Sequence, residues 1–146
     1  MKDPKLVLGI VFANVKVFRE ALKMHSIING YEFAYQINDG DRVAVVCKVG
    51  CGWRIHATQM HGSETFQIKT MKENPHKCGR TYNNKLANSS WLSQQYLDKL
   101  MDDPTWKVAA MKKLVRRDYM VNVTASQVYK AKKKALEIIQ GNFKEQ

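Results

Sequence analysis

The sequence predicts an α+β fold: a leading helix and a four-stranded antiparallel sheet, followed by a three-helix bundle of the helix-turn-helix type. Short alternating or β-branched segments, separated by tight turns, occupy residues 32–70. Apolar residues recur at helical spacing before this region and again after residue 81. A change of period from helical to alternating and back is typical of a chain whose helices are separate from its sheet.

Composition and charge restrict the class of protein. Hydrophobic residues make up 45% of the 146 residues, which excludes wholesale disorder. We expect no membrane span and no secretory signal, because the longest apolar stretch is residues 6–15 and Asp3-Pro4 interrupts the basic start. The 24 lysines and arginines against 13 acidic residues give a net charge of +11. This charge predicts a polyanionic partner: nucleic acid, an acidic membrane or an acidic protein.

The first helix is expected over residues 15–28. Asn14 has a side chain suited to an N-cap, Phe18 and Leu22 follow at helical spacing, and Asn29-Gly30 supplies a C-terminal stop. Its apolar face should pack on the segments that follow.

Four strands are expected, over residues 32–37, 42–47, 53–58 and 65–70. Asn38-Asp39-Gly40-Asp41 is a strong hairpin signal between the first two strands, and glycine-containing turns separate the others. Strands joined by such short turns form an antiparallel meander, since parallel strands need longer crossovers.

A polar linker, residues 81–90, is expected to separate the sheet domain, residues 1–80, from a helical domain, residues 91–146. The spacing of Leu92, Tyr96 and Leu100 predicts the first helix of this domain.

Capping signals predict the two helices that follow. Asp103 has the side chain of an N-cap and Pro104 suits the first helical position, and Val108, Met111, Val115 and Tyr119 then follow at helical spacing. Thr124 and Gln127 form a capping box for a last helix that Gly141 should end.

Four residues with metal-binding side chains occur as two pairs in the sheet domain: Cys47-x3-Cys51 and His76-x-Cys78. The end of a meander can return beside its beginning, so the pairs can meet. Three thiolates and an imidazole are a tetrahedral ligand set for one Zn²⁺, and four protein ligands make the site closed and structural. The alternative is three ordinary buried cysteines and a chance histidine, with His61 a weaker substitute ligand.

The residues around the cysteines follow a distinctive order: Cys-x3-Cys, then Trp53-Arg54-Ile55-x-Ala57, Phe66-x-Ile68-Lys69 and His76-x-Cys78. This order resembles the N-terminal zinc-binding DNA-binding domain of Mutator-like element (MuDR-type) transposases and their domesticated relatives. It is more distantly similar to WRKY-type zinc fingers. The WRKYGQK heptapeptide is absent, so the base-reading residues of WRKY factors have no direct equivalents here.

The resemblance implies a WRKY-like sheet with zinc at one end and, at the opposite edge, a β-ribbon that enters the DNA major groove. The candidate base contacts at that hairpin, chosen for their donor and acceptor groups, are Tyr35, Gln36, Asn38 and Arg42. The candidate phosphate contacts, which fix register without reading sequence, are Lys48, Arg54, Lys69 and Lys72. Alternatively, Asn38-Asp39-Gly40 is only turn chemistry and Tyr35 is a core residue.

The last predicted helix is a second candidate DNA surface. As the third helix of a helix-turn-helix unit it could be a recognition helix, with candidate contacts at Ser126, Gln127, Lys130, Lys133 and Lys134. The alternatives are a solvated basic face and a nuclear-import signal. Net charges of +5 for residues 1–80 and +6 for residues 81–146 favour DNA contact by both domains.

These features predict a sequence-specific binder of double-stranded DNA. It would recognise terminal inverted repeats for a Mutator-like transposase or act as a transcription factor derived from one, in the nucleus. Expected protein partners are a second copy or other transposase subunits; no membrane partner is expected. We expect no enzyme activity, because the acidic triad of the catalytic transposase domain is missing. The alternative function is a zinc-stabilised module for protein interaction or dimerisation.

Overall fold

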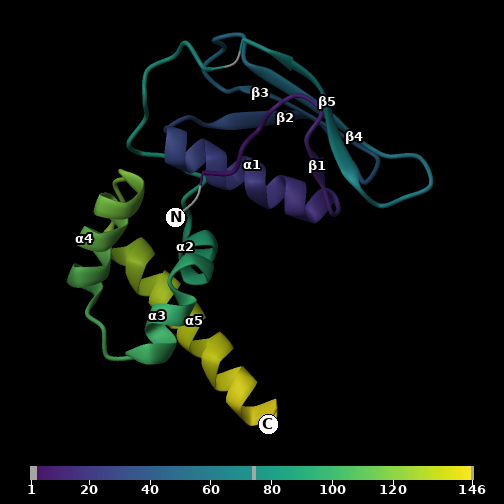
Figure 1. Cartoon of the computed structure of the whole chain (residues 1–146). Coiled ribbons are helices and arrows are strands. Elements are labelled where there is room, and N and C mark those ends of the chain that lie inside the picture. The colour runs from purple at the N-terminus through teal and green to yellow at the C-terminus, as the bar shows by residue number, and fades with distance from the viewer. Residues whose placement is uncertain (1–2, 74, 146) are drawn as a thin grey trace. The chain divides into compact units, whose positions relative to one another are not determined.

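The computed structural model describes residues 3–73 and 75–145. The chain divides into two compact units, Met1–Thr81 and Tyr82–Gln146, which we call unit 1 and unit 2. Unit 1 contains the sheet and helix α1, and unit 2 contains helices α2 to α5 (Figure 1). The predicted α+β class with an antiparallel sheet is confirmed.

The sheet of unit 1 is antiparallel throughout, with the strand order β1-β5-β4-β3-β2. Its strands are β1 (Val11–Phe12), β2 (Phe33–Asn38), β3 (Arg42–Cys47), β4 (Arg54–Gln59) and β5 (Phe66–Lys72). Four of them form the predicted meander. The fifth, β1, was not predicted, because only two residues of the apolar lead-in join the ladder.

Helix α1 (Val15–Asn29) begins and ends where its capping residues predict. The side chain of Asn14 accepts a hydrogen bond from the Val17 N–H at 2.9 Å. At the other end Gly30 adopts φ +77°, a left-handed conformation that favours glycine, and its N–H bonds to the Ser26 carbonyl. These contacts stabilise the helix at both ends.

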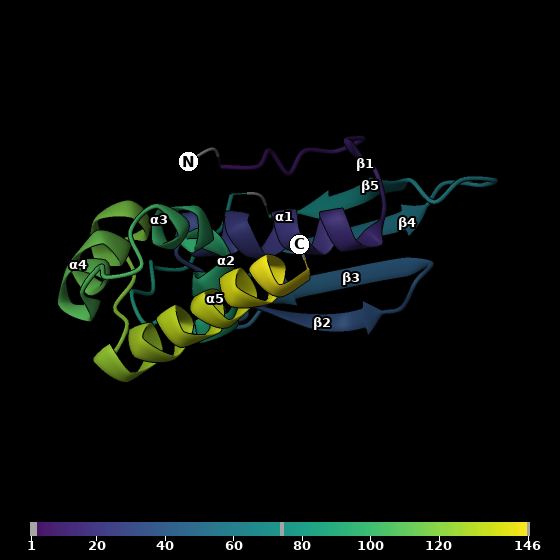
Figure 2. The same cartoon turned by 90° about the horizontal axis from the view of Figure 1, so that it is seen from below.

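The two faces of the sheet differ in character. Figures 1 and 2 show α1 running beside the sheet, and the Phe18 and Phe66 rings stack with centroids 5.8 Å apart. Side chains on this α1 face are buried, including Val45, Ile55 and Ile68. Because successive strand residues point to opposite faces, three cross-strand rows lie on the other face, and their residues other than Ala44 and Val46 are polar: Arg42–Thr58–Gln67, Ala44–His56–Thr70 and Val46–Arg54–Lys72.

Unit 2 contains four helices: α2 (Ser89–Gln95), α3 (Leu97–Asp102), α4 (Val108–Tyr119) and α5 (Ala125–Glu145). The single helix predicted around residues 92–100 is therefore two helices, with a break at Tyr96 (φ −109°, ψ 11°). The Tyr96 ring is buried and its hydroxyl donates to Asp118 on α4 at 3.1 Å. Periodicity could not reveal this break, since the apolar residues keep a four-residue spacing across it.

The capping predictions in unit 2 have mixed outcomes. Thr124 and Gln127 form the predicted reciprocal box, with N–H to side-chain oxygen distances of 2.9 and 3.1 Å. The cap at Asp103 is wrong, because its carboxylate accepts from the N–H and hydroxyl of Thr105 in a local turn, and α4 begins later. The stop at Gly141 is also wrong, since α5 continues to Glu145.

Helix α5 is the central element of unit 2. The other three helices pack on it, and they cover an apolar stripe of Val128, Ala131, Ala135 and Ile139. No helix within the described ranges is both long and apolar enough to cross a membrane.

Candidate metal centre and nucleic-acid interface

The four predicted metal ligands meet at one end of the sheet. Cys47 ends β3, Cys51 lies in the β3–β4 turn, and His76 and Cys78 follow β5. Their ligand atoms all lie within 4.8 Å of one another. The Sγ atoms of Cys47 and Cys78 are 3.6 Å apart, and the His76 Nδ1 lies 3.3 Å from Cys51 Sγ and 3.4 Å from Cys78 Sγ.

These separations fit a tetrahedral zinc site. Zinc–sulfur distances of about 2.3 Å and zinc–nitrogen distances of about 2.0–2.1 Å place two sulfurs about 3.8 Å apart, and a sulfur and a nitrogen about 3.6 Å apart. Three thiols and one imidazole are one of the donor sets that structural zinc sites use. The prediction of one structural zinc is confirmed as a ligand set, and Nδ1 is the His76 atom that faces the thiols.

Two glycines shape the turn that carries Cys51. Gly50 and Gly52 have φ values of +86° and +94°, where residues with a Cβ are strained. A Cβ at Gly52 would also lie 3.0 Å from the Glu73 side chain. The turn closes through a hydrogen bond from the Gly50 N–H to the Cys47 carbonyl at 3.1 Å. The sequence Cys-x3-Cys-Gly therefore bends the chain so that both sulfurs face one point.

Two buried aromatic rings hold the His76 imidazole. Its ring stacks on Tyr31 with centroids 3.5 Å apart and on Trp53 with centroids 4.3 Å apart. Both aromatic residues are at most 4% exposed. Sequence analysis quoted Trp53 without a role and missed Tyr31, because its position directly after a helix C-cap contains no signal of contact with a residue 45 positions later.

The surroundings of the ligands shift their pKa values. Burial lowers the pKa of His76 to about 4, which keeps the imidazole neutral and able to bind a metal. Burial opposes the Cys51 thiolate, but hydrogen bonds from the Trp53 and Lys77 N–H groups outweigh it and lower the Cys51 pKa to about 6. Burial and the neighbouring thiols raise the pKa of Cys78.

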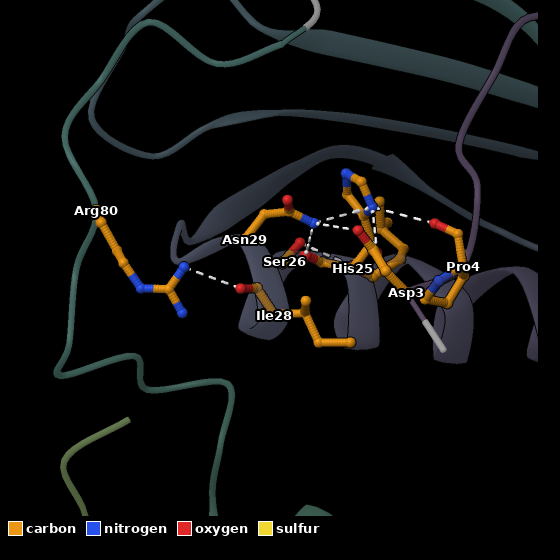
Figure 3. Close-up of polar contacts among 8 residues, drawn as sticks. Asp3, Pro4, His25, Ser26, Ile28, Asn29 and Arg80 are labelled. Carbon is orange, nitrogen blue, oxygen red and sulfur yellow. Dashed lines mark hydrogen bonds and ion pairs between the residues drawn. The ribbon is translucent and has the colours of Figure 1, made fainter. Parts of the chain in front are cut away.

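The segment after the last ligand is tied to α1 (Figure 3). The Arg80 Nη1 donates to the Ile28 carbonyl at 2.9 Å, and the Thr81 N–H donates to the Gly30 carbonyl at 2.7 Å. Gly30 also leaves space for the Arg80 side chain, which a Cβ at that position would clash with. The end of α1 is thereby connected to the ligand-bearing segment.

The start of the described chain is tied to the same helix (Figure 3). The two carboxylate oxygens of Asp3 contact His25 Nδ1 at 2.8 Å and the Asn29 amide at 2.9 Å. His25 Nδ1 also lies 3.1 Å from the Pro4 carbonyl. His25 thus has a structural contact and is not a metal ligand in this arrangement.

The four candidate base contacts lie on or beside β2, an edge strand of the sheet. All four are exposed. Register places Tyr35 and Asn38 on the α1 face and Arg42 on the opposite face, with Gln36 in a bulge between them. The hairpin thus presents polar groups on both sides of a free strand edge, at the opposite end of the strands from the cysteine cluster.

The tip of the β2–β3 hairpin is fixed by Arg19, a contact that sequence analysis missed. Its Nε donates to Asn38 Oδ1 at 3.0 Å and its Nη2 donates to the Asp39 carbonyl at 3.2 Å. The Asp39 carboxylate accepts from the N–H groups of Asp41 and Arg42, which lower its pKa. Asn38 and Asp39 therefore have turn roles, as the alternative reading predicted.

The candidate phosphate contacts are spread over unit 1. Arg54 and Lys72 are paired in register on the face opposite α1, the face that also carries Arg42. Lys69 is the extra residue of the bulge in β5. Lys48 follows β3, with its ammonium 4.0 Å from the Glu32 carboxylate.

The candidate contacts on α5 are partly engaged within unit 2. Lys134 donates to the hydroxyls of Ser89 and Ser90 at 2.9 Å each. Gln127 belongs to the capping box. Ser126, Lys130 and Lys133 are exposed, and a DNA contact by any of them stays a prediction.

Comparison with known proteins identifies part of the chain. No curated protein and no solved structure matches it. One family model, described as MuDR family transposase, matches residues 3–68. The matched segment includes Arg19, the β2–β3 hairpin and the first cysteine pair, and it ends before His76. Residues 3–68 are therefore similar to the DNA-binding domain of MuDR family transposases.

Proposed function

We propose that this chain binds double-stranded DNA in a sequence-specific manner, through the β2–β3 hairpin of unit 1. Within a transposase the target would be the terminal inverted repeats; a derived transcription factor would bind a regulatory site. The observation that supports this proposal is the free edge of β2, with base-matching side chains on both faces. This edge lies inside the segment that matches the DNA-binding family model.

Edge-first entry of the hairpin into the major groove suits this arrangement. A two-stranded ribbon fits the groove, and its two faces then point toward opposite walls. Arg42 on one face can pair with guanine, and Gln36 in the bulge can pair with adenine. Asn38 cannot use its amide oxygen for adenine while that oxygen accepts from Arg19, so it offers only N–H donors.

Metal binding supports this hairpin indirectly. Cys47, Cys51, His76 and Cys78 would hold a zinc ion, which crosslinks the β3–β4 turn to the segment after β5. The chain's own residues supply the rest of the support: Tyr31 and Trp53 orient the imidazole, and Arg19 holds the tip at the other end of the sheet. The reading edge is therefore anchored at both ends before DNA arrives.

Phosphate contacts would position the hairpin without reading sequence. Arg54 and Lys72 are paired in register on the sheet face opposite α1, and Lys48 and Lys69 add further positive charge to unit 1. We further propose a nuclear location, and a second copy or other transposase subunits as protein partners, since both follow from action on chromosomal DNA.

Selection of bound duplexes from a random library tests this function. The full zinc-loaded chain should enrich one sequence pattern, and its affinity should fall steeply as salt rises. The variant Arg42→Ala should lose preference at one position of that pattern, whereas Arg54→Ala should weaken binding to all sequences alike. No detectable binding to any duplex at about 50 mM salt would contradict the proposal and favour a protein-interaction module.

A further inference from the structure

Helix α4 carries a dense basic row that the candidate DNA contacts do not include. Lys112, Lys113, Arg116 and Arg117 are all exposed. Residues four apart lie on one helix face, so these four form two adjacent pairs along the same side. The opposite side of α4, Met111, Val115 and Tyr119, is buried. The basic row therefore faces away from the core of unit 2.

Part of this row borders a hollow at the end of α4. Its described lining residues are Tyr82, Lys113, Arg116, Arg117 and Met120, and none of these is acidic. The hollow is built by local contacts: the Asn122 N–H donates to the Tyr82 carbonyl, and Arg116 donates to the Asn122 side chain. Three cations around one opening repel each other, and an anion placed there would relieve this repulsion.

The one carboxylate on α4 pairs with a single member of the row, Arg117. Asp118 accepts from the buried Tyr96 hydroxyl at 3.1 Å and lies 3.4 Å from the Arg117 Nε. Its position is thus set by the core side of the helix. Four positive charges against one negative charge leave α4 with a net charge of +3.

We propose that this α4 surface, Lys112, Lys113, Arg116 and Arg117 with Tyr82, binds the phosphodiester backbone of duplex DNA. This inference rests on the proposed function of unit 1 and adds a second contact surface in unit 2. Lys113 and Arg117 are one helical turn apart, about 6 Å along the axis, which matches neighbouring phosphates on one strand. Guanidinium groups bind phosphate oxygens in pairs, and lysine binds them as a point charge.

The α4 surface differs from the α5 surface in placing three cations around one opening. On α5, Lys134 is held by two serine hydroxyls within unit 2. On α4, Lys113 and Arg117 both border an open hollow with other cations, and Arg117 also pairs with the Asp118 carboxylate. Backbone contacts add affinity without sequence preference, so the α4 surface should raise binding to every duplex equally.

The test compares two double variants of the full zinc-loaded chain. Lys113→Gln with Arg117→Gln removes two charges from the α4 surface and keeps Arg116, which bonds to Asn122. Lys5→Gln with Lys107→Gln removes two charges from exposed positions outside it. Affinity is measured against salt concentration, with the duplex selected above and with a random duplex of equal length.

The α4 variant should reduce the slope of log affinity against log salt by about 1.8, because each lost phosphate contact contributes about 0.9. At 0.1 M salt this corresponds to a loss of up to roughly 60-fold, equal for both duplexes. The matched control should change the slope by much less. The charge-conserving swap Lys113→Arg with Arg117→Lys should retain binding.

Other outcomes separate the two proposals. If the wild-type chain binds neither duplex, the proposed function fails. If it binds but the α4 variant is unchanged, or the control loses as much, the α4 inference alone is overturned. A changed preference between the two duplexes would also overturn it, because a backbone contact cannot cause one. Unchanged thermal unfolding of the variants checks that unit 2 remains folded.

Discussion

Unit 1 joins segments that are distant in sequence, whereas unit 2 packs neighbouring helices around one apolar stripe. The thiols of Cys47 and Cys78, which meet at the metal centre, are 31 positions apart. In unit 2 the stripe of α5 is covered by helices joined to one another by short turns. The comparison indicates that unit 1 depends on a crosslink and unit 2 on hydrophobic burial, so the two should respond to different perturbations.

The largest expected effect is that of metal removal. Chelation, or the variant Cys78→Ser, should unfold most of unit 1, because zinc binding contributes on the order of 10 kcal/mol to the folding of small metal domains. The helices of unit 2 should persist. Two-dimensional NMR resolves the units: the indole signal of Trp53 should shift to an unfolded position while those of Trp91 and Trp106 stay.

The neighbouring variant Lys77→Ser is the control for that experiment. The Lys77 side chain is exposed and forms an ion pair with the Glu73 carboxylate, a surface contact of little value. It should keep one zinc per chain. A folded, metal-free unit 1 would contradict the dependence on a crosslink.

The next effect is a cavity in unit 2. Leu100 is fully buried on α3, so Leu100→Ala should lower the unfolding free energy of unit 2 by about 2–5 kcal/mol. Zinc content should not change. The adjacent Met101 is 51% exposed, and Met101→Ala should change stability by less than about 0.5 kcal/mol. Denaturant titration measures both changes. Equal losses of unfolding free energy in the two variants would show that α3 does not pack as described.

A smaller effect is expected at the hairpin tip of unit 1, which the Arg19 side chain holds without a metal ion. Arg19→Ala removes both hydrogen bonds to the tip and should reduce discrimination between the selected duplex and single-base variants. The lost discrimination energy should be smaller than that of one good base contact, which is about 1–3 kcal/mol. Lys23→Ala, one turn further along α1, is the control. Unchanged discrimination in binding assays would leave Arg19 with a purely structural role.

A further effect concerns mild acid. All four histidines belong to unit 1, and the pKa of His76 is lowered to about 4 by burial. An unfolded histidine takes up a proton near pH 6.5, so the unfolded state binds more protons than the native state between pH 6.5 and 4. Stability of unit 1 should therefore decrease as pH falls through that window, while unit 2 is unaffected. Unfolding of the two units followed separately at pH 7 and pH 5 checks this.

The parts predicted from the sequence are those encoded by local chemistry. Asn14 and the Thr124–Gln127 box cap their helices because each cap needs only residues three positions apart. The metal ligands were predictable because cysteine and histidine have few other uses at such spacing. Capping signals fail where the same residue can serve another local structure. Asp103 caps a turn instead of α4, and a single glycine at position 141 does not end α5.

The parts that were not predicted depend on distant contacts. Tyr31 meets His76 only because the meander and the end of α1 converge. Arg19 reaches the hairpin tip from a helix whose side-chain pattern shows only an exposed cation. Strand β1 has only two residues, which is too short to show an alternating pattern. In each case the interaction belongs to the folded arrangement and not to the segment that carries the residue.

The span between Cys47 and Cys78 has a consequence for the order in which the chain folds. Closing a loop of this length has an entropic cost that grows with the logarithm of its length, and sheets with non-local pairing fold more slowly than helical bundles. The helices of unit 2 can therefore form within microseconds to milliseconds, whereas unit 1 must wait for both strand pairing and metal. During synthesis unit 1 emerges first, and we expect it to complete its folding last, and faster when more zinc is supplied.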